Sequence, residues 1–140
     1  MYKGEELKGI NFFNLLIKSK EFNMELGKLV LYSGRLESEM ILFFRRNFFN
    51  KFKINLTLGG LIKFGETNKL FDKNLIISLN MVCKQRNYLT HNIYALFIEL
   101  ADVTILEREN LLDTDVLLYM DKVYVLNENI KHLTEIINKM

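Results

Sequence analysis

The side chains best suited to chemistry gather in one stretch near the middle of this sequence, between Lys84 and Tyr94. The stretch holds His91, one of the two histidines of the chain, together with Arg86 and Asn87. Histidine titrates near neutral pH, so it can accept and donate a proton under the same conditions. Arginine keeps its charge and stabilises negative charge as it develops. This stretch is therefore the candidate active site.

Helical geometry places these residues on one polar face. At about 100° per residue, the polar side chains fall within roughly 140° of one another, beside an apolar stripe. A solvated helix face normally carries Lys and Glu, whereas this face carries side chains that orient ligands and transfer protons. The predicted catalytic residues are Arg86, Asn87 and His91, and the predicted site-lining residues are Asn80, Thr90 and Tyr94.

The spacing Arg86-x4-His91, with Asn87 directly after the arginine, resembles the R-x4-6-H motif of the HEPN superfamily of nucleic-acid-cleaving helical domains. The resemblance covers most of the chain, from a long first helix carrying Glu37 and Glu39 to a closing helix. It implies metal-independent RNA cleavage to 2′,3′-cyclic phosphate and 5′-hydroxyl ends. His91 would be the general acid–base, Arg86 would stabilise the phosphorane, and Asn87 would hold the imidazole or contact phosphate.

The resemblance also implies a partner copy. One helix supplies one histidine, whereas this type of cleavage usually needs two proton-transfer groups, so we expect a homodimer that pairs two motif helices. RNA is the expected substrate, and no cofactor and no metal are expected. An antitoxin or regulatory protein is a further expected partner, in a toxin or phage-defence setting. HEPN toxins modified by an antitoxin carry tyrosine two residues after the histidine. Ile93 occupies that position here, and Tyr94 follows it.

Alternatives of other classes stay open. A catalytically silent helical module would use the same bundle to bind a protein partner or a nucleotide, and a partner-dependent toxin subunit would be inert until an associated protein is lost. His91 would then be a surface histidine, with Arg86 in a salt bridge. Glu37 or Glu39 either reaches across to orient Arg86 or simply faces solvent.

Composition predicts a single all-α domain, and the resemblance implies that this domain is a HEPN-like antiparallel bundle of four to five helices over residues 1–140. The 140 residues are enough for one domain with a core, and 49% of them are hydrophobic. With no Pro and 7 Gly, there is little to break helices and too few turn residues for a sandwich or barrel. The net charge of +2 is too small to indicate nucleic-acid binding without local clustering.

Residues 43–53 interleave basic and aromatic side chains, an arrangement that can stack bases and hold phosphates. On this interpretation Arg45, Arg46 and, from the motif stretch, Lys84 bind RNA. The alternative is an amphipathic helix whose phenylalanines enter the core while its cations face solvent. Exposed cations would still steer RNA toward the site.

Hydrophobic periodicity predicts the helices that must position the motif. They cover residues 1–18, 21–52, 58–64, 72–100 and a closing segment that ends near residue 139. The predicted N-caps are Thr57, Asp72, and Asp113 or Thr114. The closing helix is predicted to bury Leu117, Met120, Tyr124, Ile130, Leu133 and Ile137.

No targeting signal and no apolar run long enough to span a bilayer stand out, so we expect a cytoplasmic protein that does not enter a membrane. The single cysteine, Cys83, excludes an intramolecular disulfide and fits a reducing compartment. His132 has no second ligand at metal-binding spacing and is interpreted as a solvent-facing residue.

Overall fold

The computed structural model describes residues 9–47, 56–92 and 113–140, and within these ranges it contains helices and no strand. The elements are α1 (Gly9–Lys18), α2 (Lys20–Asn47), α3 (Leu58–Thr67), α4 (Lys73–Asn87), the π-helical turn η1 (Tyr88–Asn92) and α6 (Asp115–Asn138). The predicted all-α helical bundle is confirmed. None of the described helices is long and apolar enough to cross a membrane.

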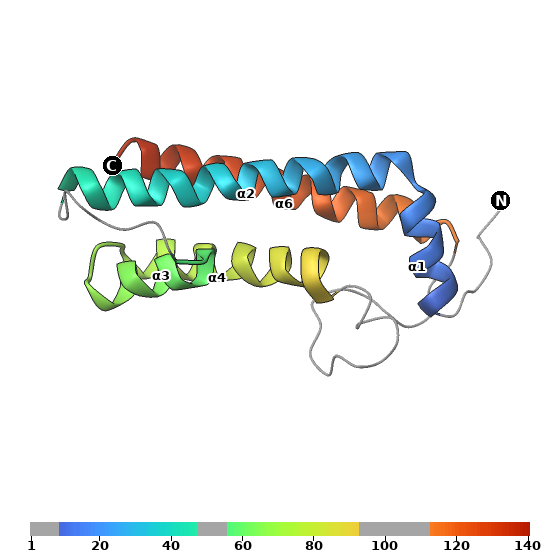
Figure 1. Ribbon diagram of the computed structural model, residues 1–140, viewed down its shortest axis with the longest axis horizontal. Coiled ribbons are helices and arrows are strands. Elements are labelled where there is room, and N and C mark those ends of the chain that lie inside the picture. The colour runs from blue at the N-terminus through green and yellow to red at the C-terminus, as the bar shows by residue number, and fades with distance from the viewer. Residues whose placement is uncertain (1–8, 48–55, 93–112) are drawn as a thin grey trace.

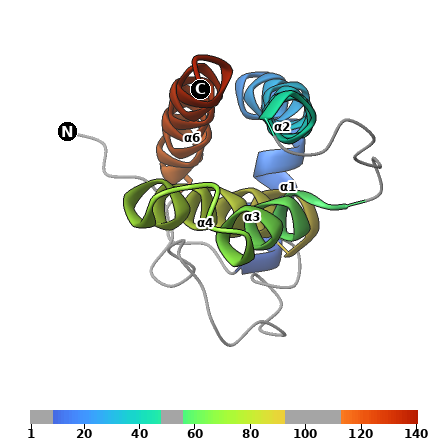
Figure 2. The same cartoon turned by 90° about the vertical axis from the view of Figure 1, so that its left-hand side faces the viewer.

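The helices form two layers (Figure 1). α2 and α6 lie side by side in one layer, and Figure 2 shows α3 and α4 covering one face of it. α1 lies across the N-terminal end of α2, where its Phe12 ring packs edge-on against Tyr119 of α6 at a centroid distance of 5.0 Å. The side chains between the two layers form the core.

The direction of the helices is mixed. α4 runs opposite to α2 and α6, as an antiparallel bundle requires, whereas α2 and α6 run the same way (Figure 1). The contacts agree: Glu25 of α2 binds Asn127 of α6, and farther along both helices Glu39 binds Asn138. Short loops force neighbouring helices to be antiparallel, but α2 and α6 are distant in sequence, so nothing imposes that direction on them.

The surface that α6 buries differs partly from the prediction. Its buried apolar residues alternate three and four positions apart, as the heptad pattern of packed helices requires: Tyr119, Val123, Leu126, Ile130, Leu133 and Ile137. Leu117 and Tyr124, which were predicted to face inward, are 61% and 51% exposed. The first half of α6 carries apolar residues on more than one face, so the spacing of the apolar residues alone could not show which face is buried.

A polar contact lies inside the interface between α2 and α6. The amide Nδ2 of Asn127 donates to the carboxylate of Glu25 at 3.1 Å and to its backbone oxygen at 3.0 Å, and both residues are buried. Lys28 supplies the compensating charge 3.3 Å from the other carboxylate oxygen of Glu25. Because a buried carboxylate is costly without partners, this contact favours one alignment of α2 on α6 over slipped alternatives.

An aromatic cluster joins the C-terminal half of α2 to α3. Phe44 lies 4.9 Å from Phe64, and Phe43 stacks on Phe71 at 5.5 Å, measured between ring centroids. The core interpretation of the basic-aromatic stretch is therefore confirmed for its first two phenylalanines, which are buried. Its residues 48–53 lie outside the described residues.

Two helices begin at the predicted caps. Thr57 Oγ1 accepts the backbone N–H of Gly60 at 3.2 Å, and Asp72 Oδ1 accepts that of Leu75 at 2.7 Å. Thr114 occupies the N-cap position of α6, but its side chain makes no cap hydrogen bond. The start of α6 was thus placed correctly, while a capping role for the Thr114 hydroxyl was wrong.

Asp72 makes a cap hydrogen bond and Thr114 does not, which gives a prediction about stability. Asp72→Ala should lower the free energy of unfolding by about 1 kcal/mol, because α4 loses the acceptor for one of its first N–H groups. Thr114→Ala, the matched control, should change it by only a few tenths of a kcal/mol. Urea unfolding followed by far-UV circular dichroism measures both values. Equal losses in the two variants would contradict a capping role for Asp72.

Candidate functional site

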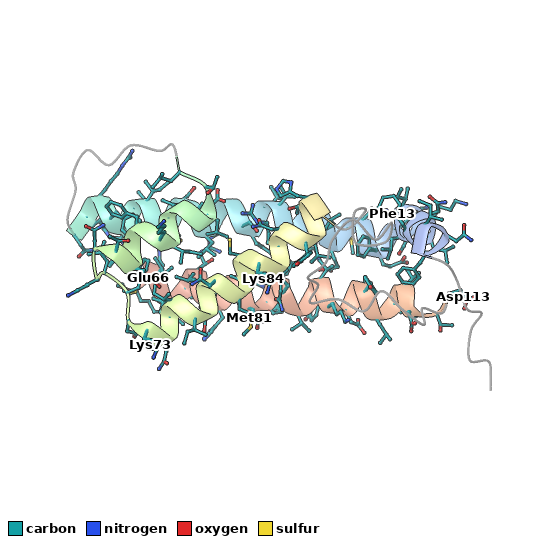
Figure 3. The ribbon with its side chains drawn as sticks, turned by 90° about the horizontal axis from the view of Figure 1, so that it is seen from below. Phe13, Glu66, Lys73, Met81, Lys84 and Asp113 are labelled. Atoms are coloured by element: carbon teal, nitrogen blue, oxygen red, sulfur yellow. The ribbon has the colours of Figure 1, made fainter. Side chains whose placement is uncertain are left out.

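The helices α2 and α3 and the continuous segment formed by α4 and η1 meet around one cavity of about 530 Å³. Its lining residues are Glu37 of α2, Thr57 and Gly59 at the start of α3, Arg86 and Asn87 at the end of α4, and His91 of η1. All three predicted catalytic residues are therefore in one place. Figure 3 shows how this happens: α4 starts at Lys73 beside α6 and crosses the layer obliquely, so that its other end reaches α2.

The motif helix changes its winding inside the motif. After Asn87 the chain continues as one π-helical turn, η1, rather than as the regular α-helix predicted up to residue 100. A π-helix closes its hydrogen bonds over five residues instead of four and so rotates less per residue. The angle between Arg86 and His91 around the helix axis is therefore smaller than the roughly 140° that separates residues five apart in an α-helix. Residues 93–100 of the predicted helix lie outside the described residues.

Arg86 is held beside a carboxylate but is not fully paired. Its Nη1 lies 4.0 Å from Oε1 of Glu37, and its side chain is 18% exposed. Its Nε is buried and has no hydrogen-bond partner within the described part of the chain. A guanidinium has five N–H donors, so an anionic group that enters the cavity finds donors available.

The contact with Glu37 shows which of the two acidic residues of α2 faces Arg86. Glu37 reaches Arg86, as one interpretation of the sequence predicted, and this is confirmed. Glu39 instead accepts a hydrogen bond from Asn138 of α6 at 3.0 Å. Residues two apart on a helix point in nearly opposite directions, about 200° apart, so only one of them could face α4.

The N-terminal end of α3 forms another wall of the cavity. Thr57 satisfies the N–H of Gly60, while the N–H groups of Leu58 and Gly59 have no intrahelical acceptor because they belong to the first turn. The partial positive charge of a helix N-terminus favours anions. Sequence reasoning identified Thr57 as a cap but missed the contribution of Thr57 and Gly59 to the site, since spacing does not show that α3 begins beside the motif.

Asn87 and Thr90 support the motif from within the helix. Asn87 Nδ2 donates to Sγ of Cys83 at 3.8 Å, and its half-buried amide lines the cavity. The hydroxyl of Thr90 donates to the backbone oxygen of Arg86 at 2.9 Å. Thr90 is thus placed to hold the backbone at the transition from α4 to η1, and it is not among the residues that line the cavity.

Of the other predicted site residues, those that the structure describes do not line the cavity. Asn80 is exposed earlier on α4, and Lys84 lies on the outer face of that helix (Figure 3). Arg45 is half-buried and Arg46 exposed in the last turn of α2. Tyr94, a predicted lining residue, lies outside the described residues.

A different part of the surface holds the second histidine. His132 is exposed on α6 and lines shallow hollows between α6 and α4, apart from Arg86. Among the residues that the structure describes, no three His, Cys, Asp or Glu side chains are grouped closely enough to hold a metal ion.

The cavity therefore combines a cation, an imidazole, a carboxylate and a helix N-terminus, a set that can bind a phosphate group and move protons beside it. Comparisons of the chain with protein-family models, curated proteins and solved structures found no significant match. The function has to be argued from this cavity and from the motif that lines it.

Proposed function

We propose that this chain is a metal-independent endoribonuclease of HEPN type, which cleaves RNA to 2′,3′-cyclic phosphate and 5′-hydroxyl ends. The observation that carries the proposal is that Arg86 and His91 line the same cavity, together with the start of α3. Glu37 of α2 and Thr57 and Gly59 of α3 line this cavity too, so the motif is at a junction of helices rather than on an open surface. The resemblance of the motif to the HEPN superfamily supplies the reaction.

Each cavity group has a defined task in this reaction. Arg86 binds the non-bridging oxygens of the scissile phosphate and stabilises the extra negative charge of the phosphorane. The N–H groups of Leu58 and Gly59 add to the positive potential at the phosphate. His91, which is exposed, transfers a proton to the leaving 5′-oxygen, while Asn87 beside it orients the substrate or the ring.

A homodimer belongs to the same proposal, and an exposed apolar face of α2 supports it. Met24 and Leu31, seven residues apart and therefore on the same side of α2, are 56% and 73% exposed, and Val30, about 100° around the helix from Leu31, is 59% exposed. A second copy of the chain would cover them. Arg45, Arg46 and Lys84 would attract RNA over longer distances, with a strong dependence on salt. An antitoxin or regulatory partner, in a toxin or phage-defence setting, is proposed from the resemblance alone.

The proposal predicts the products of a simple reaction. Purified protein incubated with single-stranded RNA in excess EDTA should cut it, because no step uses a metal ion. The 3′ fragments should accept phosphate from polynucleotide kinase without prior phosphatase treatment, and the 5′ fragments should end in a cyclic phosphate, as mass spectrometry can show. Intact RNA with a fully folded protein would overturn the proposal and favour a silent binding module. Cleavage that stops in EDTA, or that leaves 5′-phosphate ends, would also contradict it.

A further inference from the structure

We infer that Glu37 is the general base of the proposed reaction, so that one chain holds the complete set of catalytic groups in one cavity. This role rests on the proposed function and departs from the expectation that a second copy must supply the second proton-transfer group. Glu37 lines the same cavity as Arg86 and His91, although it comes from a helix about fifty residues earlier in the chain.

The reaction needs two proton transfers. One group must take the proton from the 2′-hydroxyl, and another must protonate the 5′-oxygen as it leaves. Of the residues that line the cavity, Thr57, Gly59 and Asn87 have no side chain that acts as an acid or base, and the guanidinium of Arg86 has no lone pair to accept a proton. Glu37 and His91 are therefore the two lining residues that can exchange protons.

The position of Glu37 suits a base. Its side chain is 31% exposed, so substrate can reach the carboxylate. The 4.0 Å between its Oε1 and Nη1 of Arg86 exceeds the roughly 2.7–2.9 Å of a hydrogen-bonded charge pair, so its oxygen lone pairs are not committed to the guanidinium. Glu37 comes from α2 and His91 from η1, so the two groups enter the cavity from different walls. In-line displacement at phosphorus needs two separate proton-transfer groups, one near the entering 2′-oxygen and one near the leaving 5′-oxygen.

The step balances with these two groups alone. The carboxylate of Glu37 takes the proton of the 2′-hydroxyl, and the 2′-oxygen forms a new bond to phosphorus. The bond from phosphorus to the 5′-oxygen breaks, and the imidazolium of His91 gives its proton to that oxygen. The products are a 2′,3′-cyclic phosphate and a 5′-hydroxyl, and proton exchange with water restores both side chains.

The pH dependence of cleavage tests this assignment. Within the described residues, the ionisable side chains that line the cavity with Glu37 are Arg86 of α4 and His91 of η1, and the lining residues of α3 carry no charge. Activity should rise with pH as the carboxylate ionises and fall as the imidazolium loses its proton, giving a bell-shaped profile. Glu37→Gln should lower kcat by about 10²-fold or more with little change in KM, and should remove the rising limb. Glu37→Asp should keep that limb with lower activity.

The matched control is Glu39→Gln, two residues along the same helix. Glu39 bonds to Asn138 and does not line the cavity, so kcat and the pH profile should stay as in the wild type. A Glu37→Gln variant that keeps the full bell, with only KM raised, would show that Glu37 merely positions Arg86. A wild-type profile without a rising limb would overturn the role even if the variant does not fold.

Mixing two variants tests whether the catalytic groups of one cavity come from one chain or from two. Glu37→Gln and His91→Ala chains, mixed and allowed to exchange, should stay inactive because every cavity lacks one group. Recovered cleavage would overturn the single-chain site, since it would require Glu37 of one copy to work with His91 of another. The proposed function itself would fail differently, with no cleavage by the wild-type chain in EDTA.

Discussion

His91→Ala should lower the rate of RNA cleavage by about 10²–10⁴-fold, the usual contribution of a general acid–base group. The imidazole lines the cavity beside Arg86, where the proposed reaction makes it the general acid. Because His91 is exposed, its removal leaves no buried hole and helical content should stay unchanged. Cleavage of an end-labelled RNA under single-turnover conditions measures the loss, and circular dichroism checks the fold.

His132→Ala is the control for this prediction. The second histidine is also exposed but lies on α6, in hollows that do not include Arg86. Its loss should leave the cleavage rate within about twofold of wild type, since it has no proton-transfer role. If both variants kept full activity, the imidazole of the motif would be a bystander. If both lost activity equally, the effect would come from structure rather than from chemistry.

Gly65→Ala should destabilise the fold by about 1–3 kcal/mol, the typical cost of forcing extra atoms into a packed core. Gly65 is buried in α3, and a Cβ added there would overlap the ring of Phe71. That ring cannot easily move away, because it stacks on Phe43 at 5.5 Å and lies 5.7 Å from Phe44. Urea unfolding should show a lower midpoint, with a slope close to that of the wild type.

Gly27→Ala should change the free energy of unfolding in the opposite direction. Gly27 lies in the interior of α2, and a Cβ added there meets no atom within 4 Å. Alanine then removes the entropic cost of a glycine in a helix, so the free energy of unfolding should rise by about 0.5–1 kcal/mol. The pair separates helix propensity from packing, and a loss of stability in both variants would contradict the open surface at Gly27.

Much of the secondary structure could be predicted from local chemistry. Side chains that accept a backbone N–H fixed the starts of α3 and α4 at Thr57 and Asp72, because a cap acts over three residues. Which face of α6 is buried was harder to predict: Tyr124 is as apolar as Tyr119, yet Tyr119 is buried, with Phe12 of α1 packed on its ring, whereas Tyr124 is exposed. Burial depends on neighbours that periodicity does not contain.

The candidate site, like the secondary structure, could be predicted from the sequence only in part. The sequence by itself determined that Arg86, Asn87 and His91 share one helical region, since their spacing is short and set by helical winding. Only the tertiary structure decided that α4 crosses toward α2, and that Glu37 and the start of α3 join them around one cavity. Those contacts depend on the packing of layers between segments tens of residues apart. The parallel direction of α2 and α6 was likewise set by packing, because no short loop constrains it.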